Sequence, residues 1–346
     1  MSQANAVAVV LWIVLTMYAI FAGADFGAGL WSLLSGSGES GRRPRELIDW
    51  ALGPVWEANH VWLIFAVVVL WTGFPSAFEA VFSTLFIPLS LAALGIVLRG
   101  AGFAFHHDAR RARGRARAER LFGLASVLTP FFMGTVVGAV AGGRVPIGNA
   151  TGNDVTSWLN PLSVVIGLLF VATGAYVSAV FLVSDAHRAG APDLEEYFAR
   201  RALVSAVVTG GLAALGLFAL YRHARYIFDG LTHDGLPLVI LSALCGIGVL
   251  VLLHRRAIRG TRVLAAGAVA SVIWGWGIAQ HPYLLPKTLT ISAGAAPSGT
   301  LTTVLIVFGI AVVVVLPSLA LLYTLAQRKV VVEHPRPTPD ATGGEA

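Results

Sequence analysis

Residues 6–34 read AVAVVLWIVLTMYAIFAGADFGAGLWSLL, an apolar run that contains one charged residue, Asp25. A helix needs about 20 apolar residues to cross the hydrocarbon core of a bilayer, so this run predicts a transmembrane helix. Of the 346 residues, 56% are apolar and 12% are charged, whereas a soluble domain carries roughly 25% charged residues. The composition therefore predicts an all-α polytopic membrane protein. It excludes a nucleic-acid-binding domain, and the single Cys245 excludes a disulfide scaffold.

Similar apolar runs follow as far as residue 325 and predict about nine transmembrane helices. The predicted spans are 6–34, 50–73, 77–105, 120–143, 158–184, 202–222, 236–254, 261–281 and 300–325. The segments 35–49, 106–119, 185–201 and 255–260 are expected to be polar connections. Residues 1–329 then form a single transmembrane domain, and the Pro- and Gly-containing residues 330–346 form a disordered cytoplasmic tail.

Positive charge is distributed unevenly between the two sets of connections. Of the 24 Lys and Arg residues, 19 fall after odd-numbered spans or in the C-terminal tail, 4 fall on the opposite side, and Arg99 lies within a span. The positive-inside rule then places the N-terminus outside and the C-terminus in the cytoplasm. The arginine run 110–117 is interpreted as a topogenic loop near anionic lipid rather than as a nucleic-acid site. No removable signal peptide is expected, because the first apolar run exceeds signal length.

Four ionisable residues fall well inside the predicted spans: Asp25, Glu57, His60 and Arg99. Such residues are costly in a bilayer and usually mark functional sites. At 1.5 Å per residue, Asp25, Glu57 and Arg99 lie roughly 13, 10 and 9 Å from the cytoplasmic ends of their helices. Successive antiparallel helices usually pack together. We therefore expect these charges to form a shared polar cluster in the inner half of the membrane.

Two interpretations of this cluster stay open from the residue types alone. It could be a proton-conducting site that opens toward the cytoplasm, or a buried ionic network that only fixes helix packing. His60 follows Glu57 by three residues and is interpreted as its polar neighbour. Ligation of haem by His60 would need a second axial ligand at the same depth. The candidates for that ligand, which are Met17, Met133 and His281, are poor.

Several segments carry a family resemblance. Residues 23–29 read GADFGAG, a spacing of small residues that lets helices approach closely. Residues 53–64 read GPVWEANHVWLI and are the most specific segment, and residues 98–103 and 282–286 read LRGAGF and PYLLP. Together these segments resemble subunit II of the cytochrome bd-type quinol oxidases, including the group called cyanide-insensitive oxidases. The resemblance extends over nearly the whole chain.

This resemblance implies a non-haem subunit of a complex that oxidises quinol, reduces O2 to water and resides in the bacterial cytoplasmic (inner) membrane. The b-type and d-type haems, or b-type haems only, would belong to the partner, subunit I. This chain alone would bind no haem and no metal and would contain no catalytic residue. Some members hold a structural quinone or a small single-helix accessory subunit. The fold implied is two four-helix bundles plus one peripheral helix.

The resemblance also implies roles for single residues. Glu57 matches the proton-path carboxylate, Asp25 and Arg99 match the acid of the first helix and the arginine of the third, and Trp62 matches a tryptophan near the proposed oxygen entrance. Position 57 is Glu where other members have Asp. Position 60 is His where others carry Gln or Glu, so His60 is a further candidate for the proton path.

Two competing functions remain to be tested. A secondary transporter could use Asp25, Glu57 and Arg99 as an ion or substrate site, but it would place broken helices at corresponding positions of two halves. Helix-breaking prolines instead crowd the first half of the chain. A self-sufficient cytochrome b would bind stoichiometric haem without a partner.

Overall fold

The computed structural model describes residues 2–36, 38, 41–52, 56–108, 112–150 and 152–327. Within these ranges the side chains of residues 52, 56–59, 103–108 and 112–118, and of several residues beyond 315, are not described. The predicted tail 330–346 therefore lies outside the described residues. Of the arginine run 110–117, residues 110 and 111 are not described, and residues 112–117 are described in their backbone only.

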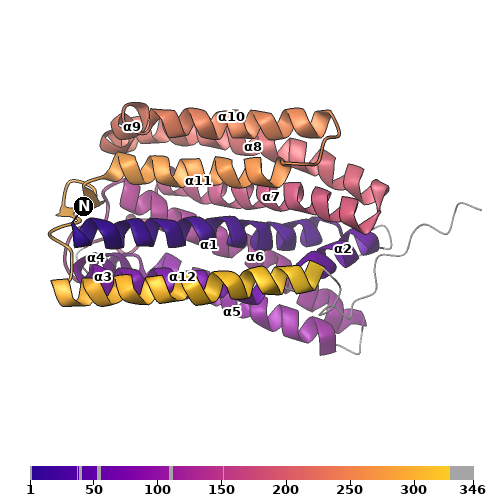
Figure 1. The fold of residues 1–346 in the computed structure, drawn as a ribbon, viewed down its shortest axis with the longest axis horizontal. Coiled ribbons are helices and arrows are strands. Elements are labelled where there is room, and N and C mark those ends of the chain that lie inside the picture. Colours follow the sequence, from indigo (N-terminus) through magenta and orange to yellow (C-terminus); the bar gives the residue numbers. More distant parts are fainter. Residues whose placement is uncertain are drawn as a thin grey trace, which may run out of the picture.

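The described chain is almost entirely helical, and its long helices lie side by side along one axis (Figure 1). The helices are α1 (Gln3–Leu34), α2 (Arg42–Leu52), α3 (Trp56–Gly73), α4 (Pro75–Thr84), α5 (Phe86–Asp108), α6 (Ala112–Ala141), α7 (Pro161–Ala189), α8 (Pro192–His223), α9 (Arg225–Thr232), α10 (Leu236–His254), α11 (Thr261–Gln280) and α12 (Ser298–Gln327). The short strands β1 (Tyr283–Leu285) and β2 (Leu289–Thr290) pair antiparallel between α11 and α12.

Within the described residues, seven helices are long and apolar enough to cross a membrane: α1, α6, α7, α8, α10, α11 and α12. Residues 60–73 and 75–84 make an eighth candidate span, bent by 118°. The apolar part of α5, Phe86–Gly102, is shorter than these spans. The predicted fold class, an all-α polytopic membrane protein, is confirmed. The count of nine spans stays a prediction.

The predicted continuous span 77–105 is wrong, because the chain breaks into α4 and α5 at Leu85. The reason is proline chemistry. Pro75 begins α4, and Pro88 lies in the first turn of α5. Proline has no backbone N–H, which is harmless in a first turn but would remove a hydrogen bond from the interior of a longer helix. The two prolines therefore mark the starts of two separate helices.

Two segments that were predicted as polar connections are largely helical. Residues 35–49 contain most of α2, whose Leu47 and Ile48 are fully buried beneath its arginine-rich face. Residues 185–201 hold the end of α7 and the start of α8, which are separated by two residues only. Gly190 ends α7 with φ of 69°, a left-handed conformation that favours glycine. These helices therefore continue beyond their apolar spans.

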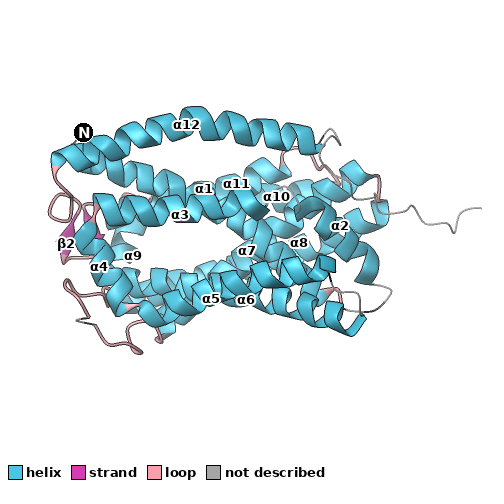
Figure 2. Ribbon diagram, turned by 90° about the horizontal axis from the view of Figure 1, so that it is seen from below, coloured by secondary structure: helices cyan, strands magenta, loops and turns pink. Residues whose placement is uncertain are grey.

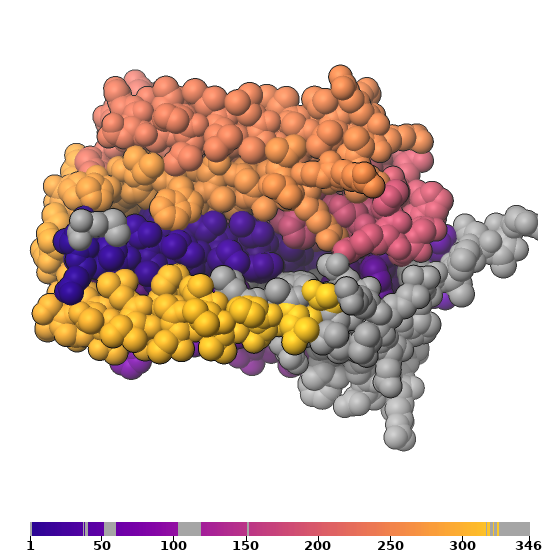
Figure 3. Space-filling model, in the orientation of Figure 1, coloured from indigo at the N-terminus to yellow at the C-terminus, as the bar shows by residue number. Residues whose placement is uncertain are grey.

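Helix α1 occupies the centre of the bundle, in contact with α3, α6, α7, α11 and α12. The helices α7, α8, α10 and α11 pack together on one side of it. Helix α5 packs on α6 on the other side, and α12 lies along α1 and α3 (Figure 2). The space-filling view shows α12 beside α1, with α11 and α10 beyond it (Figure 3). All of these contacts concern the described part of the chain.

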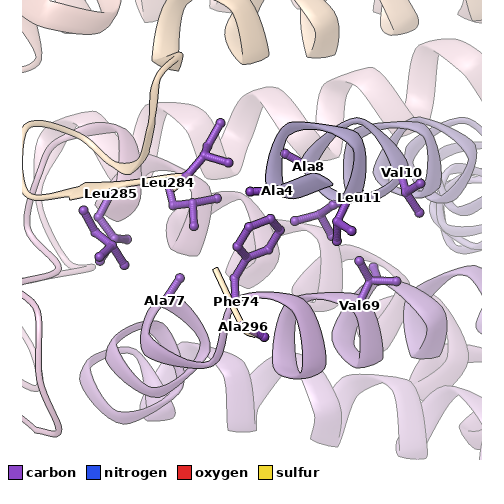
Figure 4. Packing of buried hydrophobic residues seen from close by; sticks show 14 of the residues in the cluster. Ala4, Ala8, Val10, Leu11, Val69, Phe74, Ala77, Leu284, Leu285 and Ala296 are labelled. Carbon is purple, nitrogen blue, oxygen red and sulfur yellow. The ribbon is translucent and has the colours of Figure 1, made fainter. Parts of the chain in front are cut away.

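The bend between α3 and α4 is held by a buried apolar cluster at the end of the bundle that carries the N-terminus (Figure 4). Phe74, at the bend, is fully buried among Ala4, Ala8 and Leu11 of α1. The backbone N–H of Ala296, just before α12, donates to the carbonyl of Gly73 at 2.9 Å. The bend is therefore fixed by α1 and by the loop that precedes the last helix.

Candidate functional site

Asp25 and Arg99 form an ion pair at the centre of the described bundle. Arg99 Nη1 and Nη2 each donate to a different carboxylate oxygen of Asp25, both at 2.5 Å. Nη2 also donates to the Asp25 carbonyl at 3.2 Å. The side chain of Asp25 is 0% exposed and that of Arg99 is 1% exposed. This two-point contact joins α1 to α5 and brings together two of the residues that were predicted to share a cluster.

The surroundings of Arg99 use the rest of its guanidinium. Arg99 Nε donates to Ser126 Oγ of α6 at 2.9 Å, and Ser126 Oγ donates in turn to the Phe122 carbonyl at 2.7 Å. The guanidinium also lies over the rings of Phe26 and Phe122, at 4.8 and 4.6 Å from their centroids. Such cation–π contacts favour a desolvated cation. Three helices thus surround the buried charge of Arg99.

Glycines of α1 allow neighbouring helices to reach this pair. A Cβ added to Gly27 would lie 2.0 Å from the carbonyl oxygen of Gly174 in α7, and one added to Gly29 would lie 2.1 Å from Ser126 Oγ. Neither distance is compatible with a side chain. The expectation that the small residues in 23–29 permit close helix packing is therefore confirmed at both positions.

Glu57 belongs to α3, but its side chain lies outside the described residues. The position of Glu57 along the long axis of the bundle, called its height below, can be inferred from the backbone. A Cβ added to Gly73 of α3 would lie 2.9 Å from Val7 of α1, so the end of α3 meets the start of α1. Counting along the two antiparallel helices puts the Glu57 backbone level with Gly23, within about 3 Å of the height of Asp25. A contact between Glu57 and the ion pair stays a prediction.

His60 and Trp62 lie further along α3. His60 is half-buried, and Trp62 is 8% exposed within the apolar cluster that α1 and α3 share. Counted from the same contact, Trp62 is level with Tyr18 of α1. The assignment of Trp62 to an oxygen entrance stays a prediction, as does the assignment of His60 to the proton path.

The histidines that could be considered for haem ligation lie far apart. His281 follows α11 and accepts a hydrogen bond at its carbonyl from Tyr226 Oη at 3.0 Å. This loop lies at the end of the bundle where α3 finishes at Gly73. His60 is about 20 Å before that end of α3. His60 and His281 therefore do not suit one haem iron. In the part of the chain that is described, no group of three or more His, Cys, Asp or Glu residues could hold a metal ion.

Three residues near the pair were missed in the sequence. Ser126 and Phe122 contact Arg99 from α6, and Tyr18 lies on α1 two turns before Asp25. Serine and phenylalanine are ordinary residues in a membrane helix and give no signal. Tyr18 did give a sequence signal, because it precedes Asp25 by seven residues and therefore shares its helix face.

The fold and the buried ion pair define a class of protein: a polytopic helical membrane protein in which the buried charges of Asp25 and Arg99 neutralise each other. The family model "Cytochrome bd terminal oxidase subunit II" matches residues 4–326. The chain therefore belongs to the subunit II family of the cytochrome bd terminal oxidases.

Known relatives agree with this assignment along most of the chain. A Bacillus subtilis (strain 168) protein, provisionally named as subunit II of a cytochrome bd menaquinol oxidase, is 22% identical over 92% of this chain and 94% of its own length. Subunit 2 of the Escherichia coli (strain K12) cytochrome bd-I ubiquinol oxidase is 25% identical over 90% and 89%. A chain in the structure of bd oxidase from Geobacillus thermodenitrificans matches with a TM-score of 0.75 and 28% identity, covering 94% of this chain and 98% of that one.

Family membership has three direct consequences. The chain is one subunit of a haem-containing terminal oxidase, and it works with subunit I in the complex. It is a multi-span membrane protein of a bacterial respiratory oxidase family. The two competing interpretations, a secondary transporter and a self-sufficient cytochrome b, are set aside. The expected resemblance to subunit II is confirmed.

Proposed function

We propose that this chain is the non-haem subunit of a quinol:O2 oxidoreductase in the bacterial cytoplasmic membrane. The names of its relatives specify menaquinol for one protein and ubiquinol for another, so either quinol fits. The b-type and d-type haems, or b-type haems only, would lie in subunit I. The structural quinone and the single-helix accessory subunit stay predictions. The distance between His60 and His281 along the bundle supports the assignment of haem to the partner.

The observation that carries the proposed role is the closed Asp25–Arg99 pair. Both carboxylate oxygens of Asp25 accept from one guanidinium, whose Nε is held by Ser126. Arginine does not release its proton in proteins, so Arg99 cannot relay one. We infer that Asp25 and Arg99 act as fixed charges beside the proton path and as the joint of α1, α5 and α6.

The moving proton is assigned to Glu57, with His60 one turn further along α3. Both residue types exchange protons readily, and both lie on one helix face. The inferred height of Glu57 is close to that of Asp25, about 13 Å before the end of α1 at Leu34. A proton that enters from the cytoplasmic side would then reach Glu57 beside a fixed ion pair and continue toward the haems of subunit I.

The test replaces Glu57 in the assembled complex. Glu57→Gln keeps the shape of the side chain but cannot carry a proton, so quinol-driven O2 uptake should fall on the order of 100-fold. Glu57→Asp should retain most of the activity. Glu79→Gln is the matched control, because Glu79 is an exposed residue of α4 at the opposite end of the bundle. Unchanged O2 uptake in an assembled, haem-loaded Glu57→Gln complex would remove Glu57 from the proton path.

A further inference from the structure

An apolar groove of about 320 Å³ lies between α1, α7 and α8, away from the Asp25–Arg99 pair. Its lining includes Leu30 and Trp31 of α1, Ala172 and Ala175 of α7, and Val204 and Val208 of α8. The two alanines are buried and form its floor, at 8% and 5% exposure. Val204 and Val208 are 64% and 49% exposed at its rim. The groove therefore opens on the outer surface of the described bundle.

A cation stands at one end of this groove. Arg201 lies one turn before Ser205, a lining residue whose Oγ donates to the Arg201 carbonyl at 2.7 Å. Its guanidinium lies 3.3 Å from the Tyr197 ring centroid and 5.9 Å from the ring centroid of Trp31, which lines the groove. Arg201 Nη1 donates to the Tyr197 carbonyl at 3.1 Å. Arg201 is thus held in place by aromatic rings at the mouth of the groove.

Arg201 differs in one respect from its neighbour Arg200. Arg200 pairs with Glu196 one turn earlier on α8. Among the described residues, no carboxylate lies within 4.0 Å of Arg201. Its remaining guanidinium N–H groups are therefore available to an anion from outside the chain, at the end of the bundle where the sequence predicts the cytoplasm.

We propose that the groove binds an anionic phospholipid, with an acyl chain between α1, α7 and α8 and the phosphate at Arg201. The lining from Val204 to Leu212 extends about 12 Å along α8, which suits part of one extended acyl chain. A guanidinium can donate two parallel hydrogen bonds to a phosphate. Trp31 lies near the end of α1 and Tyr197 near the start of α8, at the end of the bundle predicted to face the cytoplasm, and such rings favour the boundary between acyl chains and headgroups.

Charge and size argue against the other occupants. A quinone tail would fill the same apolar groove, but a neutral quinone head offers no anion for Arg201. A transmembrane helix of subunit I is about 10 Å across, too wide for a cavity of this volume. An anionic lipid uses both the apolar lining and the guanidinium of Arg201.

The test compares lipid retention by the purified two-subunit complex. The complex is equilibrated in mixed micelles of equal amounts of dioleoyl phosphatidylglycerol and dioleoyl phosphatidylcholine, and retained lipids are counted by native mass spectrometry. Wild type should retain phosphatidylglycerol in preference. Arg201→Gln should lower that retention about five-fold, the effect of one basic residue at an anionic membrane surface. Arg200→Gln is the matched control and should behave as wild type.

A second variant tests the groove itself and does not depend on Arg201. Val208→Trp places a large ring over the rim and should release the lipid, whereas Val263→Trp, at a position of α11 that is 75% exposed, should not. The proposal is overturned if Arg201→Gln and Arg200→Gln retain phosphatidylglycerol equally, or if Val208→Trp retains as much as wild type. It is also overturned if a density map of the complex shows a quinone or a protein helix in the groove.

Discussion

Among the described residues, Asp25 and Arg99 are the two charged side chains that are almost completely buried, and the cost of that burial decides what they can do. Removing an ion pair from water costs on the order of several kcal/mol per ion. A short contact between the two charged groups, together with further hydrogen bonds, is needed to offset that cost. Here every nitrogen of the guanidinium has an acceptor, and both carboxylate oxygens are used. The pair is therefore a weak source of net stability, but each member depends strongly on the other.

That dependence gives a prediction for the single residues. Asp25→Asn or Arg99→Met leaves one buried charge without its partner and should destabilise the complex by roughly 3–5 kcal/mol. The double variant Asp25→Asn, Arg99→Met removes both charges and should recover much of the loss. The measurement is the yield and the thermal midpoint of the assembled complex. Independent losses that add in the double variant would contradict a mutual pair.

An exposed pair provides the control for this prediction. Arg43 of α2 donates to both carboxylate oxygens of Asp193 at the start of α8, at 2.5 and 3.2 Å. The side chains of Arg43 and Asp193 are 21% and 46% exposed, so solvent screens the interaction between them. Arg43→Met should cost about 1 kcal/mol or less. A loss as large as that of Arg99→Met would mean that burial does not explain the difference.

At the scale of the elements, close helix packing around α1 depends on missing side chains. Gly27 faces Gly174 of α7 with no room for a methyl group. Gly27→Ala should therefore push α1 and α7 apart and destabilise the complex by roughly 1–3 kcal/mol, as overpacking does elsewhere. Gly210→Ala on α8 is the matched control, because a Cβ there meets nothing within 4 Å.

The two glycine variants should move stability in opposite directions. Alanine favours a helix over glycine by about 1 kcal/mol, so Gly210→Ala should be neutral or slightly stabilising. Thermal unfolding of the purified complex, followed by size-exclusion chromatography, measures both variants. Equal thermal midpoints for Gly27→Ala and Gly210→Ala would show that the contact between α1 and α7 relaxes without cost.

The elements also show what the sequence could and could not predict. The apolar runs located the long helices, because hydropathy alone decides which segments avoid water. The same criterion missed α2, whose arginines hide the buried Leu47 and Ile48. It also joined α4 to α5, although Pro75 and Pro88 carried the signal for two helix starts. The direction of the bend between α3 and α4 could not be predicted from hydropathy or from the prolines, because it depends on the residues against which Phe74 packs.

The candidate site was predictable to the same partial extent. Charged residues at depth are rare, so Asp25 and Arg99 could be placed together by counting residues from the helix ends. The hydrogen bonds of the pair could not be predicted, because the acceptor of Arg99 Nε is a serine of α6 that no sequence pattern distinguishes. The groove between α1, α7 and α8 could not be predicted from the sequence either, because most of its lining residues are ordinary apolar residues of membrane helices.

At the scale of the whole molecule, the two ends of the bundle differ. Gln3 Nε2 donates to Thr302 Oγ1 at 3.1 Å, so the N-terminus lies beside the start of α12. The loop that precedes α12 and the strands β1 and β2 lie at this same end (Figure 1). The arginine-containing residues 185–201, where α7 ends and α8 begins, and the basic connection between α10 and α11 lie at the other end (Figure 1). The charge asymmetry of the sequence thus becomes an asymmetry between two faces of the bundle.

The positive-inside rule then predicts which face meets the cytoplasm. The chain has one cysteine, Cys245, so a Cys245→Ser background leaves no thiol to label. Thr156→Cys and Ser292→Cys introduce exposed thiols at the end that carries the N-terminus, and Arg259→Cys introduces one at the basic end. A membrane-impermeant maleimide added to intact cells should label the first two. It should label Arg259→Cys only after the membrane is opened, because Arg255 and Arg256 of the same connection still hold it on the cytoplasmic side during insertion. The reverse pattern would invert the bundle and place the groove end with Arg201 outside, where the anionic leaflet could not supply its lipid.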